Sequence, residues 1–211
     1  MRLLIINNLN TVEHLWGKPL PLSGVTIRQE KIFEPAMAKE ADVIIDFDFE
    51  TEPQRIDIYK TLLQPILIAS TVYTLEELKV TVEPIVRFNN WPCKEERNLV
   101  EIAMPQNQVE KFEQIFSTLS IPFQNTKDIV GFVTARVISL IINEAFLALE
   151  EQISTKEEID IAMKLGTNYP MGPFEWCNAI GNKNVYELLA KLSLTEKRYT
   201  PASVLKQSIY E

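Results

Sequence analysis

The fold of the first part of this chain is indicated by the stretch ADVIID at residues 41–46. This stretch is apolar and rich in β-branched residues, and it has the length of one buried strand. Other apolar runs of strand length lie on both sides of it: Leu3–Ile6, Val25–Arg28, Ile66–Ala69, Ile85–Phe88 and Leu99–Ile102. Continuous apolar strands are typical of a parallel sheet that is buried on both faces.

The segments between these runs have the pattern of amphipathic helices. The candidates are Pro53–Leu63, Leu75–Lys79 and Gln108–Leu119. Strands that alternate with helices indicate an α/β domain. We therefore predict a Rossmann-like, mostly parallel sheet domain at residues 1–128.

The pattern changes near Val130, after which no strand is indicated. Gly131–Gln152 is apolar on nearly every side, so we expect a helix enclosed by its neighbours. Ser154–Glu158 contains two overlapping capping boxes, and the helix that follows should stop at Gly166. Pro173 should begin another helix, and Asn184 is a candidate cap for one more. Residues 129–211 are therefore predicted to form an all-α domain.

Composition limits the classes of partner. A net charge of −8 without a basic run argues against nucleic acid. The longest apolar stretch, Gly131–Leu149, is interrupted by Arg136, Asn143 and Glu144, which argues against a membrane span. Cys93 and Cys177 have the spacing of neither a disulfide framework nor a zinc site, so no metal is expected. We expect a soluble, cytoplasmic protein.

Three segments occur in an order that resembles a known family: Gly131-Phe132-Val133, Asn143-Glu144-Ala145, and the long string from Ile159 to Glu175. Together they resemble the carboxy-terminal helical domain of 3-hydroxyacyl-CoA dehydrogenases. A weaker, collinear resemblance runs upstream through Ala69-Ser70-Thr71, Val86–Asn90 and Leu99-Val100-Glu101. The sheet domain looks shorter than the dinucleotide-binding domain of that family.

The resemblance implies a set of catalytic positions. The family oxidises a 3-hydroxyacyl-CoA with NAD, using a His held by a Glu as the base and a Ser and an Asn to hold the reacting oxygens. By this mapping the Ser is Ser70 and the Glu is Glu101. The position of the His holds Arg87, and that of the Asn holds Ala135. An arginine is never deprotonated in practice and an alanine side chain cannot donate a hydrogen bond, so Ser70 and Glu101 would be vestigial.

Two other interpretations of these positions stay open. Arg87 and Glu101 could form a static ion pair in place of the His–Glu pair. Alternatively, the mapping slips and His14, the only histidine of the chain, takes a catalytic role. Ser70 could equally be a turn or cap residue at a strand end.

The cofactor fingerprint is also altered. A Rossmann fingerprint needs three glycines directly after the first strand, where the pyrophosphate approaches the backbone. Here Asn7, Asn8 and the residues up to Val12 follow the strand, with no glycine before Gly17. Asn7 and Asn8 are the candidate cofactor-binding residues, with Glu30 at the position of the ribose-binding acid. A solvated Glu30 is the alternative.

Three functions follow as hypotheses. The first is a degenerate 3-hydroxyacyl-CoA dehydrogenase-like protein of fatty-acid and acyl-CoA metabolism, without a cofactor but with an acyl-CoA-like ligand. The second is an active NAD(P)-dependent oxidoreductase on a 3-hydroxyacyl-CoA or related hydroxy acid, with relocated residues. The third is a non-catalytic homodimeric interaction module. For a homodimer, the apolar positions of the helical domain are Val137, Ile138, Ile141, Ile142, Ala145 and Leu149, which could equally be core.

Overall fold

The structure is a computed structural model that describes residues 1–8, 14–16, 18–19, 23–92 and 99–210. The chain folds into two compact units. The sheet domain comprises Met1–Asn90 and Glu96–Phe132, and the helical domain comprises Trp91–Glu95 and Val133–Glu211. The predicted class, a Rossmann-like α/β domain followed by an all-α domain, is confirmed.

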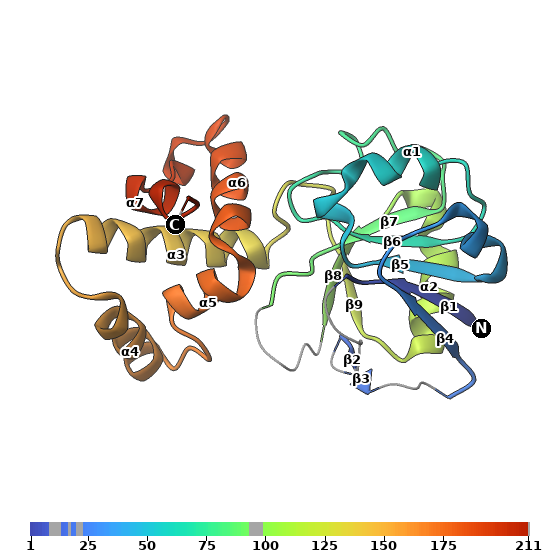
Figure 1. The fold of residues 1–211 in the computed structure, drawn as a ribbon, viewed down its shortest axis with the longest axis horizontal. Coiled ribbons are helices and arrows are strands. Elements are labelled where there is room, and N and C mark those ends of the chain that lie inside the picture. The colour runs from blue at the N-terminus through green and yellow to red at the C-terminus, as the bar shows by residue number, and fades with distance from the viewer. Residues whose placement is uncertain (9–13, 17, 20–22, 93–98, 211) are drawn as a thin grey trace. The chain divides into compact units, whose positions relative to one another are not determined.

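Seven strands of the sheet domain form one sheet in the order β4-β1-β5-β6-β7-β8-β9 (Figure 1). All neighbouring pairs are parallel except β7 and β8, which are antiparallel. The strands are β1 (Arg2–Ile6), β4 (Thr26–Glu30), β5 (Val43–Asp46), β6 (Ile66–Ala69), β7 (Ile85–Phe88), β8 (Val100–Ala103) and β9 (Phe123–Asn125). The sequence predicts six of them but not β9, because only Phe123 of its three residues is apolar and the other two are exposed.

Alternate residues of each strand face opposite sides of the sheet, and each side has its own cover. One face carries Leu3 and Ile5 and packs against α2 (Val109–Leu119). The other face carries Leu4 and Ile6 and packs against α1 (Ile56–Tyr59) and a 3-10 helix at Pro35–Glu40. The central strands are therefore buried on both faces.

The connection from β1 to β4 contains a short hairpin, β2 (His14–Leu15) and β3 (Lys18–Pro19). Leu15 and the following Trp16 are buried on the α2 face of the sheet. The Trp16 ring lies edge-on to Phe88, with ring centroids 4.8 Å apart. Leu15 and Trp16 thus supply apolar cover at a place where a doubly wound fold uses a helix.

Two helix predictions in the sheet domain are corrected. The helix expected over residues 53–63 is α-helical only at Ile56–Tyr59, after a 3-10 turn at Pro53–Arg55. Pro65 disfavours helical backbone in the residue before it, so the chain must be extended on entering β6. The helix expected at Leu75–Lys79 is a single turn, which Lys79 ends in the left-handed conformation at φ 55°.

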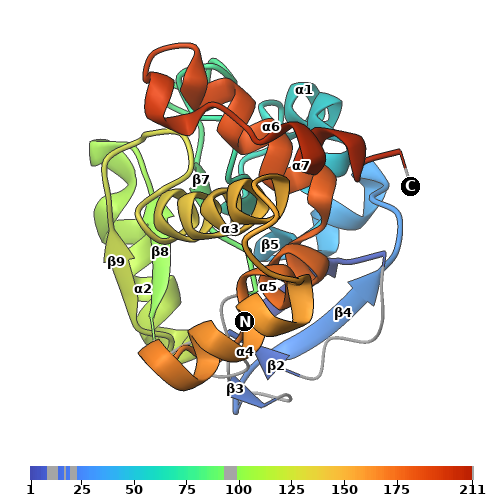
Figure 2. The same cartoon turned by 90° about the vertical axis from the view of Figure 1, so that its left-hand side faces the viewer.

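The described residues of the helical domain form five α-helices. Figure 2 labels them. They are α3 (Thr134–Glu150), α4 (Lys156–Thr167), α5 (Pro173–Ile180), α6 (Asn182–Ser193) and α7 (Ser203–Gln207). Helix α3 packs against α5, α6 and α7. Asn143 of α3 donates to the carbonyl of Thr200 and accepts from the amide of Ala202, so it holds the carboxy-terminal segment.

The expected helix ends are partly correct. Thr155 and Glu158 form the predicted capping box, and Pro173 begins α5. Helix α4 runs past Gly166, and Asn168 takes the left-handed cap position at φ 56°. The start of α6 is set by Gly181, whose φ of 95° favours glycine, and not by Asn184.

The expectation that α3 is enclosed on nearly every side is only partly correct. Ile138, Ile142 and Ala145 are buried in the core, but 57% of Val133 and 53% of Val137 are exposed. Among the described residues, no helix has both the length and the apolar content that a membrane crossing needs.

One contact explains the spacing of the string from Ile159 to Glu175. The carboxylate of Asp160 accepts hydrogen bonds from the amides of Phe174 (2.8 Å) and Glu175 (3.2 Å), so it caps the first turn of α5. A Cβ atom on Gly172 would overlap the Asp160 side chain. Position 172 must therefore be glycine for Asp160 to reach the helix end.

We predict that Gly172→Ala destabilises the helical domain by about 2 kcal/mol, because the Asp160 cap is displaced. Gly166→Ala is the matched control, since a Cβ there meets nothing within 4 Å and α4 is helical at that position. It should stabilise the domain by about 0.5–1 kcal/mol. Urea unfolding followed by circular dichroism measures both, and an equal effect of the two substitutions would contradict the role of Asp160.

Candidate functional site

The sheet topology places the candidate site beyond the carboxyl ends of the parallel strands. Strand β1 has β4 on one side and β5 on the other, so the strand order reverses there. In open α/β sheets, ligands bind outside the carboxyl ends of the strands at such a point. Asn7 and Asn8 follow β1, and Asp46 to Asp48 end and follow β5.

The first two backbone amides after β1, those of Asn7 and Asn8, are already bonded within the chain. The Asn7 amide donates to the carbonyl of Glu30 (3.0 Å), and the Asn8 amide donates to the carboxylate of Asp48. The Glu30 side chain accepts from Arg28 at 2.8 Å. Of the predicted cofactor-binding loop, residues 9–12 lie outside the described residues, as does the side chain of His14.

A second amide at this edge has a similar partner. The amide of Val72, which follows β6, donates to the carboxylate of Glu50. Exposed backbone amides beyond parallel strands are the groups that usually hold phosphates. Here carboxylates of Asp48 and Glu50 take that role and bring negative charge. A phosphate bound at either amide would therefore have to replace a carboxylate.

Asp46, the last residue of β5, forms a buried polar network. Its carboxylate accepts from the Tyr59 hydroxyl (2.6 Å), from Arg55 Nη1 (3.1 and 3.2 Å) and from the amide of Asp48 (2.9 Å). Burial raises the pKa of Asp46, and the hydrogen bonds from Tyr59 and Arg55 oppose that rise. The network positions the β5 turn and leaves Asp46 fully buried.

The partner of Glu101 is Asn89. The antiparallel pairing of Phe88 with Ile102 places these two side chains opposite each other on the same face of the sheet. Asn89 Nδ2 donates to Glu101 Oε2 at 2.8 Å, and the Thr71 hydroxyl lies 3.5 Å from Asn89 Oδ1. Thr71 and Asn89 are almost fully buried. We call Thr71, Asn89 and Glu101 the polar cluster.

The predicted ion pair between Arg87 and Glu101 is wrong. Arg87 Nε donates to Asp128 Oδ1 at 2.5 Å, while Nη1 and Nη2 donate to the carbonyls of Ser70 and Ile129. The register explains the difference, because Arg87 is paired across the strands with Ala103 and not with Glu101. An antiparallel β7–β8 pair, recognised from the short connection between the two apolar runs, would have identified Asn89 from the sequence.

Three further residues considered in the sequence, Ser70, Ala135 and Cys177, are all buried. The Ser70 hydroxyl is buried and donates to the carbonyl of Tyr73 (2.8 Å), as a turn residue does. Ala135 is buried in the first turn of α3, in the helical domain. Cys177 is buried in α5, and burial raises the pKa of its thiol to about 12, so the thiol stays protonated.

The polar cluster supplies hydrogen-bonding groups from Thr71 and Asn89 and one carboxylate from Glu101. An asparagine amide donates and accepts hydrogen bonds but does not take up a proton at neutral pH. Asn89 therefore cannot replace an imidazole as the base for a hydroxyl proton. Among the described residues, no group of three His, Cys, Asp or Glu side chains is placed to hold a metal ion.

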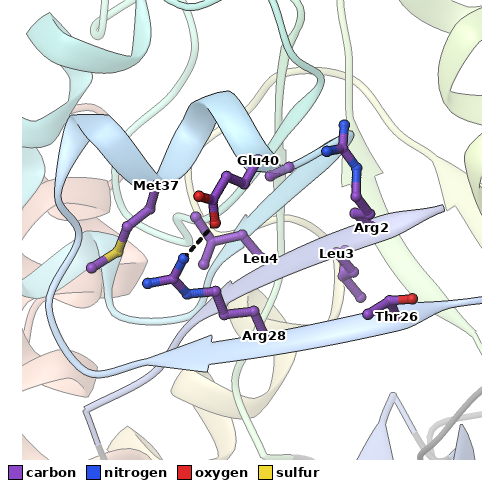
Figure 3. A pocket seen from close by; sticks show the side chains of 8 residues that line it. Arg2, Leu3, Leu4, Thr26, Arg28, Met37 and Glu40 are labelled. Carbon is purple, nitrogen blue, oxygen red and sulfur yellow. Dashed lines mark hydrogen bonds and ion pairs between the residues drawn. The ribbon is translucent and has the colours of Figure 1, made fainter.

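A surface pocket of about 310 Å³ lies at the opposite edge of the sheet, beside the amino ends of β1 and β4 (Figure 3). Arg2, Arg28, Met37 and Glu40 are among its lining residues. Its two arginines are already paired, Arg2 with Asp42 (2.6 Å) and Arg28 with Glu30 and Glu40. The pocket thus has neither free charge nor proximity to the polar cluster.

Comparison with known proteins gives a consistent result. The family described as 3-hydroxyacyl-CoA dehydrogenase, C-terminal domain, matches residues 131–211. The 3-hydroxyadipyl-CoA dehydrogenase of Escherichia coli (strain K12) is 40% identical over 82 residues, which cover 38% of this chain and 17% of that protein. A probable 3-hydroxybutyryl-CoA dehydrogenase of Bacillus subtilis (strain 168) is 25% identical over 191 residues, which cover 82% and 65% of the two chains.

The fold has a solved counterpart in the (S)-3-hydroxybutyryl-CoA dehydrogenase of Ralstonia eutropha. The TM-score is 0.71 at 22% identity, over 88% of this chain and 70% of that one. An identity this low supports the shared fold and no more. The chain spans less than two thirds of the length of the two curated relatives that it matches above.

We predict that Tyr59→Phe lowers the free energy of unfolding by about 1.5–3 kcal/mol, because Asp46 loses a charge-assisted hydrogen bond. The folded-state pKa of Asp46 is above its unfolded value of about 3.9. Ionisation of Asp46 therefore lowers the free energy of unfolding as pH rises from the unfolded pKa through the folded pKa. Removing the hydroxyl raises that pKa further. The destabilisation should therefore be larger at pH 7 than at pH 4.

Urea unfolding of the variant and of the unsubstituted protein at each pH measures this difference. Tyr210→Phe is the control, since 85% of Tyr210 is exposed, and it should have no effect. A loss that is the same at both pH values would contradict the ionised Asp46.

Proposed function

We propose that this chain, whose residues 131–211 match the carboxy-terminal domain of 3-hydroxyacyl-CoA dehydrogenases, is a member of that family without dehydrogenase activity. It would act in acyl-CoA metabolism as a non-catalytic protein, with the polar cluster as the place for an acyl-CoA-like ligand. The observation that carries this proposal is the hydrogen bond from Asn89 to Glu101. The family reaction needs a base, and loss of a positioned base typically costs on the order of 10²- to 10⁴-fold in rate.

The backbone amides that follow β1 and β6 support the same proposal. The Asn8 and Val72 amides are bonded to the carboxylates of Asp48 and Glu50. Burial raises the pKa of Asp48, and the bond from the Asn8 amide lowers it in part. A dinucleotide would gain no free donor from these two amides. The alternative, an active NAD(P)-dependent oxidoreductase, needs a base other than an imidazole, because the residue that bonds to Glu101 is Asn89.

The test is an assay of the purified protein with NADH and a short-chain 3-ketoacyl-CoA. We expect no oxidation of NADH above the rate without protein, and no change of NADH fluorescence up to millimolar cofactor. A relative with proven activity serves as the positive control. Oxidation of NADH that disappears in Glu101→Gln would show that the chain is an active dehydrogenase and would overturn the proposal.

We also propose that the protein forms a homodimer through the helical domain. The support is a set of exposed apolar side chains on α3 and α4: Val137 (53% exposed), Ile161 (52%) and Leu165 (83%). Of the six positions considered from the sequence, Ile138, Ile142 and Ala145 are core, so they take no part in this surface. A cytoplasmic location is part of the same proposal.

Light scattering at micromolar concentration should give the mass of a dimer, and Leu165→Glu should give a monomer because a buried unpaired charge opposes association. Leu63→Glu is the matched control, since Leu63 is 87% exposed and lies in the sheet domain. This control should remain dimeric. A monomeric unsubstituted protein, or dissociation caused equally by both substitutions, would remove the proposal.

A further inference from the structure

Arg87 is a fully buried arginine on β7. It belongs neither to the polar cluster nor to the amide–carboxylate pairs of Asn8 and Val72. Its planar guanidinium donates in three directions: to Asp128 (2.5 Å), to the Ser70 carbonyl (3.0 Å) and to the Ile129 carbonyl (2.6 Å). Its central carbon lies 4.1 Å from the centre of the Phe132 ring. Three of these four partners lie in the segment Asp128–Phe132, which begins 41 residues further along the chain.

The same segment makes two further bonds to the region that follows β6. The Gly131 amide donates to the Thr71 carbonyl at 2.8 Å, and the Glu76 amide donates to Asp128 Oδ2 at 3.1 Å. Asp128–Phe132 is thus bonded both to Arg87 of β7 and to the residues that follow β6. It is also the last part of the sheet domain, because the helical domain resumes at Val133.

The backbone of this segment needs such an attachment. Gly131 has φ 82° and Phe132 has φ 50°, and the second value is unfavourable for a residue with a large side chain. Phe132 is nevertheless fully buried, beneath the guanidinium of Arg87. Unfavourable backbone conformations persist only where the surrounding contacts hold them.

We propose that the Arg87 side chain holds Asp128–Phe132 in this conformation and so determines where the chain leaves the sheet domain. The role is separate from the proposed loss of dehydrogenase activity and would stand if that activity were found. It depends on the planar donors of arginine. A lysine has one charged group at a single point and cannot reach Asp128, Ser70 and Ile129 together.

The test is amide hydrogen exchange in Arg87→Met and Arg87→Lys, followed by mass spectrometry or NMR. We expect the amides of residues 129–133 to exchange roughly tenfold faster or more in both variants, while those of β1 change little. Arg55→Met is the matched control, because Arg55 is also a buried arginine with a carboxylate partner, Asp46, in the same domain. It should accelerate exchange around α1 and leave residues 129–133 unchanged.

A second variant covers the case in which the Arg87 variants do not fold. Asp128→Asn removes the charge of the partner carboxylate, whose side chain is 28% exposed and so tolerates substitution better than Arg87. It should accelerate amide exchange in the same five residues, 129–133. In Arg87→Ala, adding methylguanidinium at millimolar concentration should restore protection there, whereas urea at the same concentration should not. Unchanged exchange at residues 129–133, or a rise shared equally by all amides of the sheet domain, would overturn the proposal.

Discussion

Central strands of the sheet are buried on both faces, so polar groups must find partners at the edge where β5, β6 and β7 end and the antiparallel β8 begins. A buried polar group without a partner costs about 1–3 kcal/mol, and more if it is charged. The chain meets this requirement with pairs of its own residues: Asp46 with Tyr59 and Arg55, Arg87 with Asp128, and Glu101 with Asn89. The architecture of this edge follows from that constraint.

The same constraint bears on function, because a ligand has to compete with the partners that these groups have inside the protein. The Asn8 and Val72 amides would suit a phosphate, but Asp48 and Glu50 already accept from them. Asn89 satisfies Glu101 without providing a base. In both places the polar groups are satisfied by other residues of the same chain.

In the helical domain, side-chain hydrogen bonds to backbone groups determine the path of the chain. Asp160 caps α5 across fourteen residues because Gly172 leaves room for it, and Asn143 holds the segment at Thr200 and Ala202. This explains why the string from Ile159 to Glu175 is so specific a pattern. Its residues are linked by steric fit and hydrogen bonds and not only by hydrophobic periodicity.

The sequence by itself determined the two-part architecture, six of the seven strands in the main sheet, and the capping box at Thr155, because apolar period and capping are local properties. It also pointed to Glu101, and it located Arg87 without its true partner. Only the tertiary structure decided which side chains meet: the antiparallel register of β7 and β8 brings Asn89 to Glu101, and the path of the chain brings Asp128 to Arg87. Such pairs are separated by twelve and forty-one residues, and no local pattern encodes a contact that depends on strand register and on the return of a distant segment.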